Sequence, residues 1–178
     1  MESRFKTSSG KIALFVVMTA VTVIANLIMV PMPQPLAEYD LAPVMIYTLG
    51  VLLDPILAIL CIAVAMGIGV SYKMVLFGFP PVFVIGAMLV RGLEAGIISY
   101  IVRLRRSENV KTITTWEIFV MGLGAVWETV GFYGIDWYLF GQGAASIDLF
   151  TIVDLIFIPI AVGVIIGVRR SLKTNTLT

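Results

Sequence analysis

Long apolar runs separated by short polar segments dominate the pattern along this chain. The runs do not alternate apolar and polar residues as barrel strands do, and inside a bilayer only helices and closed barrels satisfy the backbone. We therefore predict an all-α integral membrane protein, a bundle of six transmembrane helices forming a single domain over residues 1–178. The predicted spans are residues 12–30, 41–53, 55–72, 80–104, 115–133 and 149–168.

Two of these runs need a separate argument. The run at 12–30 follows basic residues like a secretory signal, but it exceeds the usual apolar region of about 7 to 15 residues, so we predict a first span. The run at 41–53 would be about 20 Å long as a helix, against a hydrocarbon core of about 30 Å. Asp54-Pro55 ends it, because proline disfavours helical geometry in the preceding residue. Whether this segment crosses or only dips into the membrane stays open.

Charge placement sets the predicted orientation, because short cytoplasmic segments collect Lys and Arg. Six spans with both termini cytoplasmic leave only Lys73 in an outer loop. The inner basic residues are then Arg4, Lys6, Lys11, Arg103, Arg105, Arg106, Lys111, Arg169, Arg170 and Lys173. The outer loops would be residues 31–40, 73–79 and 134–148, and they carry Glu38, Asp40, Asp136 and Asp148. We expect a multi-pass protein of the cell membrane with an acidic outer mouth.

Composition supports the lipid environment and narrows the chemistry. Hydrophobic residues make up 60% of the chain and charged residues 13%, against about 45 to 50% and about 25% in soluble domains. There is no histidine and only one cysteine, Cys61, which argues against disulfides, most metal sites and histidine catalysis. We expect no enzyme, no cofactor, no metal and, at a net charge of +1, no nucleic acid partner. A phosphate-binding lysine loop is also lacking, so uphill transport would need a partner ATPase.

Charged residues inside the predicted spans are the first candidates for function, because they are costly in lipid. Arg91 lies in the fourth span, and Glu94 shares its helix face. They form either an internal ion pair or ligand contacts. Glu128 and Asp154 fall in the outer halves of the fifth and sixth spans, and we expect them to converge at one depth. Each is either a satisfied structural group or part of a binding site.

Aromatic residues surround Glu128 at the outer end of the fifth span. Trp127, Tyr133, Asp136 and Trp137 belong to this stretch. Aromatics at a helix end usually form an interfacial belt. Interleaved with acids and glycines, they also suit a ring-shaped polar ligand, which stacks on flat faces and donates hydrogen bonds to carboxylates. Both interpretations stay open.

Small residues recur every four positions on two spans, as Cys61, Ala65 and Gly69 on the third and as Gly163 and Gly167 on the sixth. Such rows let lipid-embedded helices approach closely. They predict either packing inside the bundle or docking of another membrane subunit.

The chain as a whole resembles the substrate-binding (S) components of energy-coupling-factor (ECF) vitamin transporters. The resemblance rests on the six short spans, on the acidic, aromatic fifth span, and on the stretch Leu-Val-Arg-Gly-Leu-Glu-Ala-Gly at 89–96 followed by a basic loop. The resemblance implies a subunit that captures a vitamin near the outer face, with residues 31–40 as a lid. It also implies a membrane coupling protein and two cytoplasmic ATPases as partners.

By position, the resemblance puts five residues in the pocket and two in the lid. The pocket residues are Trp127, Glu128, Tyr133, Asp136 and Asp154, and the lid residues are Glu38 and Tyr39. The coupling protein would dock on Ala13, Ala20 and the Cys61, Ala65 and Gly69 row. Many members carry Ala-x-x-x-Ala on the first span, whereas here Val17 follows Ala13.

The acidic mouth and the pair Glu128 and Asp154 favour a cationic or donor-rich ring, thiamin-like or pyridoxine-like, over an anion. An Arg91 that is not neutralised would favour an anion instead. The alternative function is a membrane scaffold of the rod-shape type, similar in size and span number but without a small-molecule ligand. A small membrane enzyme is a third hypothesis, for which the sequence offers no catalytic set.

Overall fold

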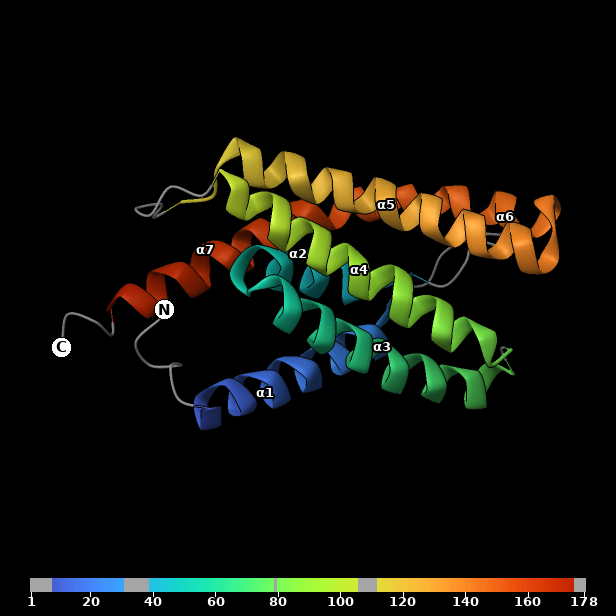
Figure 1. Cartoon of the computed structure of the whole chain (residues 1–178), viewed down its shortest axis with the longest axis horizontal. Coiled ribbons are helices and arrows are strands. Elements are labelled where there is room, and N and C mark those ends of the chain that lie inside the picture. Colours follow the sequence, from blue (N-terminus) through green and yellow to red (C-terminus); the bar gives the residue numbers. More distant parts are fainter. Residues whose placement is uncertain (1–7, 31–38, 79, 106–111, 175–178) are drawn as a thin grey trace.

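The computed structural model describes residues 8–30, 39–78, 80–105 and 112–174, and it is almost entirely helical (Figure 1). The helices are α1 (Ser8–Leu27), α2 (Ala42–Leu52), α3 (Pro55–Phe77), α4 (Val82–Leu104), α5 (Thr115–Phe140), α6 (Gln142–Asp148), the 3-10 helix η1 (Leu149–Phe157) and α7 (Ile158–Thr174). Two short antiparallel strands, β1 (Met29–Val30) and β2 (Tyr39–Asp40), join α1 to α2.

Five helical stretches are long and apolar enough to cross a membrane. They are Ser9–Leu27, Pro55–Phe77, Val82–Leu104, Thr115–Phe140 and Gln142–Ser171, the last of which combines α6, η1 and α7. Large apolar side chains such as Ile12, Ile56, Ile85 and Val130 are exposed on their outward faces, where lipid is the only solvent that suits them. The chain is therefore a multi-pass helical membrane protein.

The short helix α2, which is not among these five stretches, lies inside the bundle. Its eleven residues rise about 16 Å, roughly half of the hydrocarbon core. All of them except Met45 are buried, so α2 is a core element surrounded by the long helices. The chain leaves α2 through extended Leu53, and the Asp54 side chain accepts a hydrogen bond from the Leu57 backbone to cap α3.

Two segments predicted as outer loops are helical instead. α3 continues to Phe77 and stops at Gly78, whose φ of 73° suits glycine, so Lys73 is a buried helical residue rather than a loop residue. Most of residues 134–148 belong to α5 and α6, which are separated by a turn at Gly141 with φ of 85°. Backbone groups close to lipid gain by pairing within a helix, and this outweighs the turn preference of the glycines.

The first residues of α1 and the last residues of α7 lie at one end of the bundle, which we call the terminal end (Figure 1). The α3–α4 and α5–α6 connections lie at the opposite end, which we call the turn end. α2 occupies the half of the bundle nearer the terminal end. There, buried Glu117 on α5 forms an ion pair with Arg169 on α7 and a capping box with Thr114.

Small residues close the α1–α3 interface. Cys61 and Ala65 are completely buried, and a Cβ at Gly69 would collide with the Asn26 Oδ1 atom on α1. This row is therefore used for packing inside the chain. In contrast, a Cβ at Gly163 or Gly167 on α7 would meet no described atom within 4 Å.

Candidate functional site

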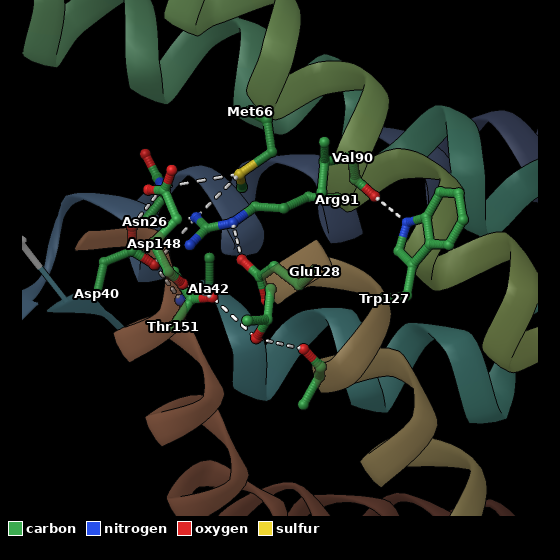
Figure 2. A network of polar contacts seen from close by, with 12 residues as sticks. Asn26, Asp40, Ala42, Met66, Val90, Arg91, Trp127, Glu128, Asp148 and Thr151 are labelled. Atoms are coloured by element: carbon green, nitrogen blue, oxygen red, sulfur yellow. Dashed lines mark hydrogen bonds and ion pairs between the residues drawn. The ribbon is translucent and has the colours of Figure 1, made fainter. Parts of the chain in front are cut away.

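A network of buried charges occupies the bundle interior (Figure 2), and Arg91 on α4 is at its centre. Its Nε donates to Glu128 Oε1 on α5 at 2.7 Å, and its Nη1 lies 3.3 Å from Asp40 Oδ2. The Met66 sulfur is 3.6 Å from the same Nη1. Arg91 is thus neutralised by Glu128 and Asp40, and neither an ion pair nor a hydrogen bond joins it to Glu94 in the described part of the chain.

Asp40, directly before α2, ties four helices together. Its Oδ2 accepts from Lys73 Nζ on α3 at 2.9 Å and from Asn26 Nδ2 on α1 at 2.8 Å, besides Arg91 on α4. Its Oδ1 accepts from the Ala42 backbone at 2.8 Å, so Asp40 also satisfies the first turn of α2. With 4% exposure, this carboxylate has exchanged water for four donors.

Sequence analysis missed two members of this network and the role of a third. Asn26 is an uncharged polar residue in a span, and such residues deserved the scrutiny given to charges. Lys73 is predicted in an outer loop, whereas α3 continues past it to Phe77. Asp40 was counted only as part of an acidic mouth, although an acid just before the predicted start of a helix is a common capping signal.

Three carboxyl groups from three elements converge beside Arg91. Glu94 on α4 and Glu128 on α5 are 0% exposed, and Asp154 on η1 is 2% exposed. Glu128 is the common neighbour, since it interacts electrostatically with both Glu94 and Asp154. Each residue lies twelve positions from the turn-end residue of its span, which is Val82, Phe140 or Gln142. That Glu128 and Asp154 share one depth stays a prediction, but the two interact electrostatically, as do Glu128 and Glu94.

This interior holds more negative than positive groups. Its acids are Asp40, Glu94, Glu128 and Asp154, and its bases are Lys73 and Arg91. Both oxygens of Glu94, Glu128 Oε2 and Asp154 Oδ1 have no hydrogen-bond donor among the described residues. Burying an uncompensated carboxylate costs several kcal/mol. The cluster therefore favours a bound cation, a donor-rich ligand or protons.

Two tyrosines border the carboxyl groups. Tyr47 on α2 is 0% exposed, lies within electrostatic range of all three, and its Oη has no partner in the described part of the chain. Tyr39 on β2 is also buried and donates to the Phe150 carbonyl of η1. Burial, followed by the negative charges of Asp154 and Glu128, raises the pKa of Tyr39. This predicted lid residue thus fastens β2 to η1.

Two aromatic residues of the fifth span, Trp127 and Trp137, are partly exposed on the outside of the bundle. Figure 2 shows Trp127 on the far side of Glu128, where its indole N–H donates to the Val90 carbonyl at 3.1 Å. Trp137 is 57% exposed, and its ring centre is 6.0 Å from that of half-buried Tyr133. Trp127 also lines an apolar groove of about 560 Å³ between α4 and α5. Trp127 and Trp137 thus face the outside of the bundle, where lipid surrounds it.

The remaining predicted residues are spread over the molecule. Asp136 is buried and interacts electrostatically with Asp148. Glu38 lies outside the described residues. Ala13 and Ala20 are exposed on the outward face of α1, whereas the Cys61, Ala65 and Gly69 row faces inward.

Comparison with known protein families, curated proteins and solved structures finds no match to this chain. No set of three or more His, Cys, Asp or Glu side chains suited to a metal ion occurs within the described ranges. The buried charges themselves are therefore the basis for a functional argument.

Proposed function

We propose that this protein is a membrane-embedded capture subunit for a small cationic or donor-rich molecule, acting as the substrate-binding component of an ECF-type vitamin importer. The observation that carries the proposal is the surplus of buried carboxyl groups around Glu128. Unpaired buried charge is costly in a membrane protein and is found chiefly at functional sites. A thiamin-like or pyridoxine-like ring would supply the missing donors or positive charge.

The position of the cluster suits capture from outside. Glu94 and Glu128 are each about 18 Å along their helices from the turn end, at 1.5 Å per residue. α2 fills the terminal half of the bundle, and the charge network lies where α2 begins. A ligand entering from the turn end would therefore meet Asp40, Arg91 and Glu128 as the floor of its site.

Charge placement supports the orientation that this proposal needs. Lys11, Arg103, Arg105, Arg169 and Arg170 belong to the helix ends at the terminal end, which by the positive-inside rule is cytoplasmic. The turn end then faces outward. If short α2 is counted with the five long stretches, six passes would put both termini on the cytoplasmic side, as the proposal requires.

The neutralisation of Arg91 supports a cationic over an anionic ligand, because its guanidinium is already engaged by Glu128 and Asp40. The partners implied by the proposal are a membrane coupling protein and two cytoplasmic ATPases. Co-purification of a coupling protein with the tagged chain from its native membrane would test this part separately.

The test of capture is ligand identification followed by calorimetry. Native mass spectrometry of the detergent-extracted protein should show a bound small molecule of this class. Glu128→Gln should weaken its binding by about 1 to 3 kcal/mol, because a buried carboxylate acceptor is lost. The matched control is Glu117→Gln, the same change on the same helix, which also breaks an arginine pair but lies at the terminal end.

Equal affinities of Glu128→Gln and Glu117→Gln would contradict the role of the cluster. A protein that carries no small molecule and binds neither thiamin nor pyridoxine would contradict capture and favour the scaffold alternative, which needs no ligand.

A further inference from the structure

We propose that Glu94, Glu128 and Asp154 form a proton-holding site that exchanges its protons for the positive charge of the ligand. This inference rests on the proposed function and adds a coupling to it: capture of a cation releases protons to the outer aqueous side. The buried cluster then stays close to neutral in both states.

The contacts among the carboxyl groups are the first support. Glu128 interacts electrostatically with both Glu94 and Asp154, and neither Glu94 oxygen nor Asp154 Oδ1 has a hydrogen-bond donor among the described residues. Carboxylates buried side by side repel when all are ionised, so protons held among the three groups would stabilise the cluster. The Arg91 Nε occupies only the Oε1 atom of Glu128 and leaves Oε2 without a donor among the described groups.

Charge balance is a separate reason to expect protons in the cluster. The charged groups that face the cluster are Arg91 from α4, Lys73 from α3 and Asp40 from β2, with the phenol of Tyr47 from α2. Lys73 and Arg91 offset two of the four acids. Ionising all of the acids would leave two uncompensated negative charges in a site that is at most 2% exposed at the three carboxyl groups, a state that burial strongly disfavours.

Tyr47 is the second observation, separate from the acids. Its side chain is 0% exposed, and its Oη has no partner within the described ranges although it lies in the field of all three carboxyl groups. A buried hydroxyl is normally hydrogen-bonded. A ligand or an altered proton arrangement at Glu94 would give Tyr47 its partner.

The exchange step is balanced without any further reactant. As a cationic ligand arrives, the O–H bond of a protonated carboxyl group breaks and its electron pair stays on the oxygen. The proton leaves to water on the turn side, and the new carboxylate pairs with the ligand. A monocation should therefore displace about one proton.

Infrared spectroscopy of the ligand-free protein at pH 7 tests the proton store directly. We expect a C=O stretching band of protonated carboxyl groups that weakens in Glu94→Gln and in Asp154→Asn. Glu117→Gln is the control and should leave the band unchanged, because Glu117 is held ionised by Arg169. Absence of the band would overturn the inference while leaving capture intact.

Thiamin, a ring with a permanent positive charge, is the probe for the exchange. On binding it should weaken the band, and calorimetry in two buffers of different ionisation enthalpy should report about one proton released per thiamin. Binding with an unchanged band and no buffer dependence would overturn the exchange but not the capture. Loss of the C=O stretching band on adding sodium alone would identify a sodium site and would also overturn the proposed exchange of protons for the ligand. Absence of binding by any cationic ring would remove the proposed function and the exchange together.

Discussion

At the scale of single residues, Asp40 is the residue of the network that contacts the most helices. It accepts from Asn26, Ala42, Lys73 and Arg91, which belong to four different helices. Removing the charge of one member of a buried ion pair leaves the others uncompensated, which costs more than the intact pair contributes. Asp40 therefore links the stability of the fold to the floor of the candidate site.

Asp40→Asn should lower the free energy of unfolding by about 3 to 5 kcal/mol, because Lys73 and Arg91 would share fewer negative partners. Thermal unfolding in detergent measures this as a clear fall in Tm. Asp54→Asn is the matched control, since Asp54 is exposed and asparagine caps a helix about as well. Similar Tm values for the two variants would show that the Asp40 contacts add little.

At the scale of elements, the α1–α3 interface positions Asn26 for the network. Gly69 allows the Asn26 amide to lie against the α3 backbone, with its Nδ2 donating to Asp40 and lying 3.7 Å from the Met66 sulfur. Close helix approach through small residues is the usual source of stability between membrane helices. Packing and site geometry thus depend on the same glycine.

Gly69→Ala should destabilise the protein by about 1 to 3 kcal/mol through overpacking, because its Cβ would collide with Asn26 Oδ1 and displace the amide from Asp40. Gly163→Ala should cause no loss, since no described atom lies within 4 Å of its Cβ. Denaturation in detergent compares the two. A tolerated Gly69→Ala beside a harmful Gly163→Ala would mean that α7, rather than α3, uses its small residues for packing within the protein.

At the scale of the whole molecule, the bundle has two chemically different ends. Basic helix termini gather at the terminal end, where Arg169 also pairs with Glu117 and Arg105 lies 4.5 Å from the ring centre of Trp116. At the turn end the spans close through Gly78 and Gly141. This asymmetry sets the expected orientation in the membrane.

Cysteine labelling measures that orientation. Ser9→Cys and Ser171→Cys, both exposed at the terminal end, should react only with a reagent admitted to the cytoplasmic side, and Ser146→Cys near the turn end only from outside. The native Cys61 is fully buried and serves as the unlabelled background. Labelling of Ser9→Cys and Ser146→Cys from one side would contradict the proposed topology.

The sequence alone determined that the chain is helical and crosses a membrane, because apolar runs of this length have no other solution in lipid. It also picked out Arg91, Glu128 and Asp154, since charge within a span is rare enough to be noticed without a structure. Counting residues along the spans predicted a common depth for Glu128 and Asp154.

Only the tertiary structure decided which of these charges meet. Arg91 pairs with Glu128 and Asp40 rather than with its helix neighbour Glu94, and buried Lys73 pairs with Asp40. The position of α2 as a buried core helix and the outward placement of Trp127 and Trp137 were likewise not fixed by local pattern. Periodicity gives the face of a helix, but the groups opposite that face come from distant segments, and their contacts set the energy of a buried charge.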